Sequence, residues 1–156
     1  MAGDLPGHRP IGRCGLGRTA KQRGAFDAMS ATLESRFAYA SIGLAIVHFV
    51  LETAYTIFVG QSFLGYLPDC IADTLLLVGA YMLLKNPRAV GILCGAWGFT
   101  FCLHYRTWAW RFEEHMAGAL NEVQTGIMYV LALTMIISLF CFAVSLAMNW
   151  PGTSFH

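Results

Sequence analysis

The sequence has few charged residues, and that scarcity narrows the class of protein. Only 12% of its 156 residues are Asp, Glu, Lys or Arg, whereas 56% are hydrophobic. Soluble domains carry about 25% charged residues. The five cysteines show no CxxC or CxxH spacing, which argues against a local zinc motif and a disulfide framework. The basic residues form no surface patch, so no nucleic-acid partner is expected. The composition indicates an integral membrane protein in contact with the lipid bilayer.

Sequence signatures of enzymes are also missing. The chain contains no GxSxG motif, no HExxH motif and no phosphate-cradling glycine loop. The links between its apolar runs are too short to build a catalytic domain. An enzyme is therefore the least favoured class, and any catalysis would have to take place among the helices themselves.

The sequence does contain four apolar runs of roughly 20 residues, which is the length that crosses a bilayer. They lie near 38–59, 66–84, 89–109 and 124–148. The predicted fold class is all-α, an integral membrane four-helix bundle. Pro87 lies between the second and third runs, where it ends one helix and begins the next. The third link, 106–123, is longer and amphipathic, with tryptophans suited to a membrane interface.

The termini are predicted to be cytoplasmic arms. Residues 1–37 precede the first run, and 1–28 are rich in Gly and Arg without periodicity, which indicates disorder. A start at Met29, with 1–28 derived from an upstream start site, is an alternative hypothesis. Residues 149–156 form a short tail. Of the ten Lys and Arg residues, all but Arg106 and Arg111 lie on the side of the termini. The positive-inside rule therefore places both termini in the cytoplasm, and a bacterial inner membrane is the expected location.

The first run carries three polar side chains on one helical face. His48, Glu52 and Tyr55 are spaced i, i+4 and i+7 within 41–59. An acid at the centre of a span costs roughly 2.5–3.5 kcal/mol on insertion scales, so an intramembrane Glu is a functional candidate by default. The structural alternative is that Glu52 is protonated or paired with His48 or with a hydroxyl of a neighbouring helix.

Ionisable residues of the other runs fall at a similar depth. At about 1.5 Å per residue, Glu52 lies about 21 Å and His104 about 22 Å from the cytoplasmic ends of their runs. Asp73 lies about 6–10 Å below the outer boundary. The three side chains are therefore predicted to meet in the outer half. Two alternatives remain, a helix-start role for Asp73 at the headgroups and an interfacial position for His104. The outer rim is predicted to contain Asp69, Arg106 and Gln124.

Stripes of small residues predict close helix packing. Gly91 and Gly95 give the third run a small face. In the fourth run, small side chains recur at i, i+4, i+7 and i+11, and their hydroxyls can donate to carbonyls one turn back. These residues are Thr134, Ser138, Cys141 and Ser145.

Three functional hypotheses follow from these residues. The first is an outer-half site that binds or passes a proton, a cation or a small molecule, because histidine titrates near neutral pH and because carboxylates with aromatics such as Tyr55 bind organic cations. The second is a divalent metal held by carboxylates and histidines; haem is disfavoured because His48 and His104 differ by about 7 Å in height. The third is an accessory subunit of a larger membrane complex, or a homo-oligomer, with a purely structural polar network.

The four-span plan is similar to that of DoxX-like proteins and of the small multidrug-resistance transporters. The latter carry a functional glutamate in the first span, as this chain carries Glu52. Their surrounding motif is not present around Glu52 and this chain is longer, so the likeness is one of plan.

Overall fold

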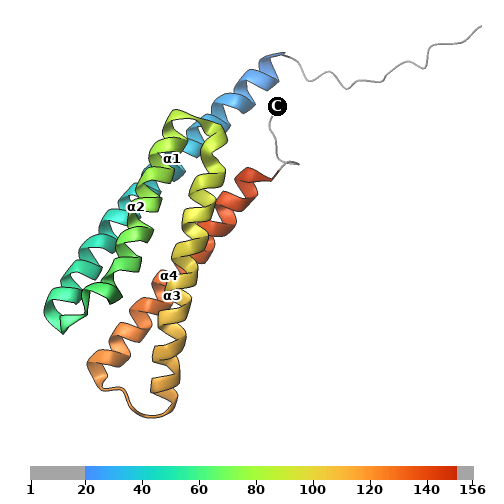
Figure 1. The fold of residues 1–156 in the computed structure, drawn as a ribbon. Coiled ribbons are helices and arrows are strands. Elements are labelled where there is room, and N and C mark those ends of the chain that lie inside the picture. Colours follow the sequence, from blue (N-terminus) through green and yellow to red (C-terminus); the bar gives the residue numbers. More distant parts are fainter. Residues whose placement is uncertain (1–19, 151–156) are drawn as a thin grey trace, which may run out of the picture.

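The computed structural model describes residues 20–150, with side chains from residue 31 onward, and this range is all-α (Figure 1). It contains no strand. The elements are α1 (Ala20–Tyr55), a π-helix (Thr56–Gly60), α2 (Phe63–Lys85), a 3-10 helix (Pro87–Ala89), α3 (Val90–Met116) and α4 (Glu122–Asn149). The four predicted helices are therefore present.

The ends of the helices are fixed by local chemistry. Gly60, with φ of 79°, ends the π-helix, and Gly118, with φ of 68°, follows α3; both adopt the left-handed conformation that glycine tolerates best. The Ser62 hydroxyl accepts a hydrogen bond from a backbone N–H in the first turn of α2. Asn121 and Gln124 form a reciprocal capping box at the start of α4.

The first helix begins earlier than the sequence predicts. Residues 20–37 belong to α1 and are not the irregular arm expected for 1–37. The prolines and most glycines of the N-terminal segment lie before residue 18, and only Gly24 interrupts the good helix formers that follow. The rest of the predicted arm and the last six residues of the tail lie outside the described residues.

The third helix is also longer than predicted. It continues to Met116, so the link before α4 is only 117–121. The expected amphipathic link at 106–123 is therefore mostly helical. Trp108 and Phe112 stack one turn apart with ring centroids separated by 5.1 Å. Neither Gly nor Pro occurs between Arg106 and Met116, so nothing in that stretch breaks the helix.

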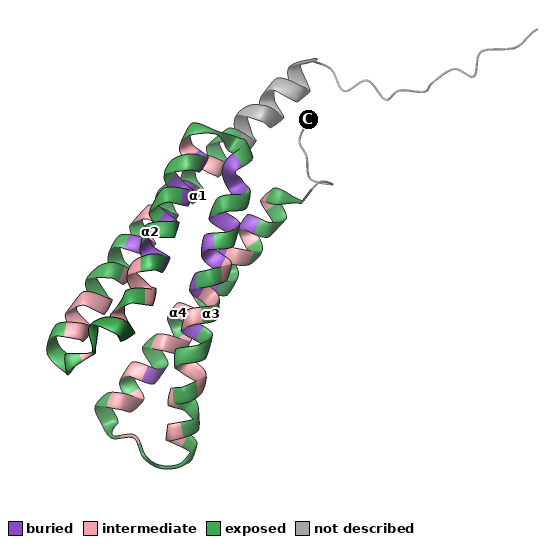
Figure 2. Ribbon diagram, viewed as in Figure 1, coloured by how far each residue is buried: buried purple, intermediate pink, exposed green. Residues whose placement is uncertain are grey.

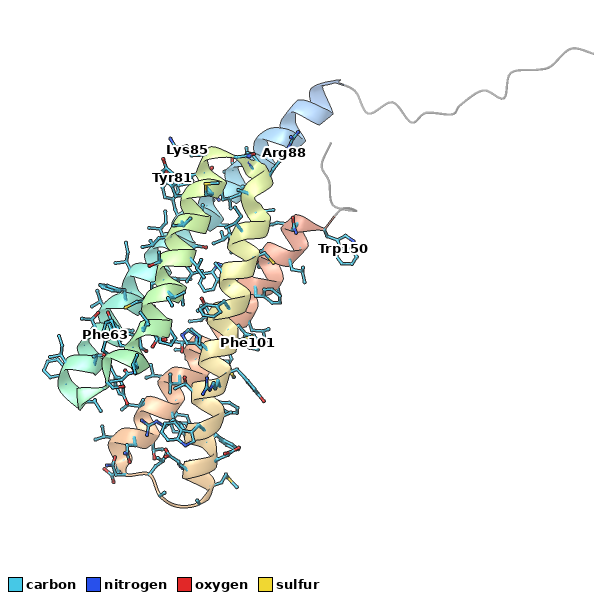
Figure 3. The ribbon with its side chains drawn as sticks, in the orientation of Figure 1. Phe63, Tyr81, Lys85, Arg88, Phe101 and Trp150 are labelled. Atoms are coloured by element: carbon cyan, nitrogen blue, oxygen red, sulfur yellow. The ribbon has the colours of Figure 1, made fainter. Side chains whose placement is uncertain are left out.

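The helices form two hairpins that diverge toward one end. α1 packs on α2, α2 on α3 and α3 on α4. Figure 1 shows the α1–α2 hairpin and the α3–α4 hairpin moving apart toward the links 61–62 and 117–121. We call the end with the links 61–62 and 117–121 the pocket end. The opposite end, which contains the 86–89 turn and the end of α4, is the terminal end. Figure 3 shows Lys85 and Arg88 at the terminal end and Phe63 at the pocket end.

Three helical segments are long and apolar enough to cross a membrane, by length and composition. They are Ala31–Gly60, Phe63–Lys85 and Glu122–Asn149. α3 does not meet this measure, because its second half carries charges such as Arg106 and Arg111. It nevertheless has a strongly buried face, coloured purple in Figure 2, and that face includes Leu93, Trp97 and Thr100. α3 thus has one buried face, while many of its other residues are exposed.

Gly79 on α2 lies close to the backbone of α3. A Cβ there would stand 3.0 Å from the Leu93 Cα of α3. The predicted packing role of Gly91 and Gly95 is wrong within this chain, because both are exposed. A Cβ at Gly95 would meet nothing within 4 Å, and one at Gly91 would only reach Asn149 at 3.8 Å. Gly79 on α2 is thus the glycine that packs against a neighbouring helix, whereas Gly91 and Gly95 are exposed on α3.

The predicted seam of α4 is largely buried. Ser138, Cys141 and Ser145 are buried, and Thr134 is half-buried. The Ser138 and Ser145 hydroxyls each donate a 2.8 Å hydrogen bond to a carbonyl about one turn back. These bonds satisfy polar groups inside an apolar helix.

Candidate functional site

A continuous chain of hydrogen bonds joins one side chain from each of the four helices. His48 Nδ1 on α1 lies 2.9 Å from Asp73 Oδ1 on α2. His48 Nε2 lies 2.9 Å from His104 Nε2 on α3. His104 Nδ1 lies 2.8 Å from the Ser138 hydroxyl on α4. We call these four side chains the relay.

The relay lies inside the fold. Asp73, His104 and Ser138 retain 3%, 6% and 1% of their accessible surface, and the His48 side chain retains 11%. Burying polar groups is unfavourable unless hydrogen bonds compensate, so the network accounts for their tolerance in an apolar bundle. One atom is left over: Asp73 Oδ2 is buried without a hydrogen-bond partner among the described residues.

The hydroxyl of Ser138 sets the direction of the hydrogen bonds. Its single proton is donated to the Thr134 carbonyl, so its oxygen accepts from the Nδ1–H of His104. A neutral His104 then has a bare Nε2, which accepts from His48 Nε2–H. One further proton is shared between His48 Nδ1 and Asp73 Oδ1.

The geometry of these hydrogen bonds allows that proton three positions. It can lie on Asp73, with both rings neutral, or on His48, with Asp73 ionised. It can also reach His104 when His48 passes its Nε2 proton across the 2.9 Å contact. All three arrangements have the same total charge and keep every relay hydrogen bond, so they differ only in where the proton lies.

Glu52 lies beside the relay without joining it. Its Oε1 is 3.9 Å from His48 Nε2, one helical turn away, and its side chain is 21% exposed. The sequence pattern indicated Glu52 as the central residue, grouped with Asp73 and His104. The structure does bring these side chains together, but His48 is the residue that contacts both Asp73 and His104.

A pocket of about 590 Å³ lies between the diverging hairpins at the pocket end. His104 belongs to its wall as well as to the relay, so the buried proton chain borders the pocket. Its polar lining comprises Glu52, Tyr55, Gln61, Asp69, His104, Arg106, Thr107 and Arg111. Its size is within the range of small-molecule sites.

Tyr55 was predicted to take part in ligand or proton binding. It lines the pocket, but its hydroxyl is paired with Arg111. Its hydroxyl accepts a 3.1 Å hydrogen bond from Arg111 Nη2. The same guanidinium donates to Glu114 at 3.3 Å and lies 5.2 Å from the centroid of the Trp110 ring. Arg111 is therefore held in place by three neighbours.

The predicted rim residues separate into two groups. Asp69 and Arg106 line the pocket. Gln124 does not; its side chain accepts from the Asn121 backbone N–H at 3.1 Å and so completes the cap of α4. Gln124 therefore has a structural place in the fold.

His48 and His104 lie closer together than residue counting predicts, so their predicted difference in height does not separate the rings. Counting residues separates His48 from His104 by about 7 Å, whereas their Nε2 atoms are 2.9 Å apart. Side-chain reach and helix tilt close the gap. Two zinc–nitrogen bonds of about 2 Å at the tetrahedral angle would hold the two nitrogens about 3.3 Å apart, so the 2.9 Å contact is that of a direct hydrogen bond. Within the described residues, no group of three His, Cys, Asp or Glu side chains has the geometry of a metal site.

Ser138 is the site residue that sequence reasoning missed. It was noted only as part of a packing stripe. Nothing local distinguishes it from Thr134 and Ser145 of the same stripe, because its role depends on His104 of another helix.

The chain matches no known family model, and neither the curated proteins nor the solved structures include one with significant similarity to it.

Proposed function

We propose that this protein is a four-span integral membrane protein that binds a proton in the relay and a small molecule in the adjoining pocket. Three helices have the length and composition of spans. The fourth, α3, is the helix whose inner face the others cover, and its charges lie toward the pocket end. Lys85 and Arg88 at the terminal end support a cytoplasmic location for that end. The pocket then faces the outer side.

The observation that carries this proposal is the contact between His48 and His104. It links a buried carboxyl to the pocket wall through groups that both donate and accept protons. When the relay has lost its mobile proton, His48 is neutral with its proton on Nδ1 and Asp73 is ionised. A proton that arrives from the pocket then enters between the two Nε2 atoms; His48 takes it on Nε2 and its Nδ1 proton moves to Asp73. The three residues thus form a proton-binding unit with one entrance.

On the side of the terminal end, the relay meets a packed apolar layer. Leu76, Leu93 and Trp97 are all buried there. The Trp97 indole N–H donates to the buried Ser41 hydroxyl at 3.1 Å, so the polar groups of this layer are paired with each other. In this conformation a proton therefore exchanges only with the pocket. This favours a site that binds a proton together with a ligand, and it disfavours an open proton channel.

A pH jump on proteoliposomes adsorbed to a solid-supported membrane electrode tests this function without a known ligand. Protons that enter a site inside the bilayer displace charge, so the wild type gives a transient current that decays to the level of protein-free liposomes. His48→Asn and Asp73→Asn abolish it, since each removes a site of the mobile proton. Glu113→Gln, an exposed acid on α3, is the matched control and keeps the current.

Helical circular dichroism and gel filtration establish that each variant is folded. A wild-type trace equal to that of protein-free liposomes would overturn the proposal. So would full transients in folded His48→Asn and Asp73→Asn. A sustained current in the wild type would instead show an open path through the layer of Leu76 and Leu93.

A further inference from the structure

The charges of the pocket are sorted by helix. The carboxylates come from α1 and α2, as Glu52 and Asp69, whereas the guanidinium groups come from α3, as Arg106 and Arg111. α4 contributes only apolar lining, Ile127 and Leu131. The pocket therefore has an acidic wall, a basic wall and an apolar wall.

The acidic wall and the basic wall each contain one charged group without a partner. The Asp69 carboxylate and the Arg106 guanidinium have no hydrogen bond or ion pair within the part of the chain that the structure describes. Glu52 has only the 3.9 Å contact to His48. Arg111, by contrast, is held by Glu114 and Tyr55. The groups that remain for a ligand are thus two acids facing one base.

The acidic wall has a further acceptor in its backbone. Pro68 lies inside α2, and a proline has no N–H to donate to the carbonyl four residues earlier. That carbonyl belongs to Leu64, and both residues line the pocket. It adds a neutral acceptor to the side on which Glu52 and Asp69 lie, so this wall suits a group with several N–H donors, such as a primary ammonium.

We infer that the pocket takes a small zwitterionic group, with an ammonium on the Glu52–Asp69 wall and an oxyanion on Arg106. A ligand with a single charge would leave either the exposed Arg106 or the half-buried Asp69 without an opposite charge in the pocket. Ile127 and Leu131 suit a short aliphatic portion. This chemistry occurs in free aliphatic amino acids and in the headgroup of an aminophospholipid. The inference rests on the proposed function, since it names the ligand class of the same pocket.

Calorimetric titration of the protein in phosphatidylcholine nanodiscs tests the free amino acid. The probes are L-leucine and its two singly charged analogues, 3-methylbutylamine and 4-methylpentanoate. We expect leucine to bind at least tenfold more tightly than either analogue. Arg106→Gln reduces leucine to the affinity of the amine, and Asp69→Asn reduces it to that of the acid. The matched controls Arg88→Gln and Glu113→Gln, which lie outside the pocket, leave all three affinities unchanged.

A second arm tests the lipid. Native mass spectrometry of protein extracted from mixed phosphatidylethanolamine and phosphatidylcholine bilayers is expected to retain phosphatidylethanolamine if the headgroup is the ligand. Arg106→Gln and Asp69→Asn then lose it, while Arg88→Gln keeps it. Zwitterion selectivity in either arm supports the inference and identifies the source. Its absence from both arms, or equal effects of Arg106→Gln on leucine and on the amine, overturns it. If the pH-jump current persists in that case, only the ligand class fails and the proton site stands.

Discussion

His48 Nε2 lies 2.9 Å from His104 Nε2, although the two residues are 56 positions apart in the chain and belong to α1 and α3. The rings are tilted by 59° with centroids 4.9 Å apart. This contact joins the Asp73 carboxyl on one side to the Ser138 hydroxyl on the other. It thereby turns four isolated polar residues into one network and brings that network to the wall of a pocket.

Ser138→Ala should destabilise the fold more than Ser145→Ala does. Both serines are buried and both bond to their own backbone, but only Ser138 also accepts from a side chain of another helix, His104. Its loss leaves a buried N–H unpaired, which costs about 1–3 kcal/mol. Unfolding in mixed detergent, followed by circular dichroism, measures the difference. Equal losses in the two variants would show that the cross-helix bond has little weight.

Gly79→Ala should weaken the contact between α2 and α3. The new methyl group would lie 3.0 Å from the Leu93 Cα, a backbone atom that cannot move aside alone, and overpacking of this kind costs about 1–3 kcal/mol. Gly95→Ala is the matched control, since it meets nothing within 4 Å and should stabilise α3 by about 0.5–1 kcal/mol. The same unfolding assay compares them. A neutral Gly79→Ala would contradict the close packing described here.

Glu52→Gln should keep the pH-jump current that His48→Asn loses. Glu52 Oε1 is 3.9 Å from His48 and makes no relay hydrogen bond, so the mobile proton retains its three positions without it. The amplitude of the transient charge is the quantity to compare. If Glu52→Gln removes the charge as completely as His48→Asn, then Glu52 is itself a proton site and the relay must be extended to it.

The sequence was sufficient for the helices and for most of the polar cluster. Apolar runs separated by Pro87 and by glycines predict four helices, and an ionisable residue in an apolar run stands out wherever it faces. Residue counting predicted a common depth for Glu52, Asp73 and His104, and all three lie next to His48.

What the sequence could not give is which side chains touch. His48 and Glu52 differ in height by one helical turn, which is less than helix tilt and side-chain reach can shift a side chain. The sequence therefore pointed to Glu52 as the centre of the site, whereas the centre is His48. The outward face of Gly91 and Gly95 is likewise indistinguishable from an inward one until the partner helix is placed. Ser138 looked like any packing serine, since its role depends on a histidine of another helix.

Histidine ¹⁵N magnetic resonance in bilayers tests the relay most directly. In protein labelled at the imidazole nitrogens, with His48→Asn and His104→Asn used for assignment, the account predicts a protonated Nδ1 on His104. It also predicts a nitrogen–nitrogen correlation between His48 Nε2 and His104 Nε2 across their shared hydrogen bond. A neutral His104 protonated at Nε2, without that correlation, would contradict the account, because the chain from Asp73 to Ser138 would then be broken at its centre.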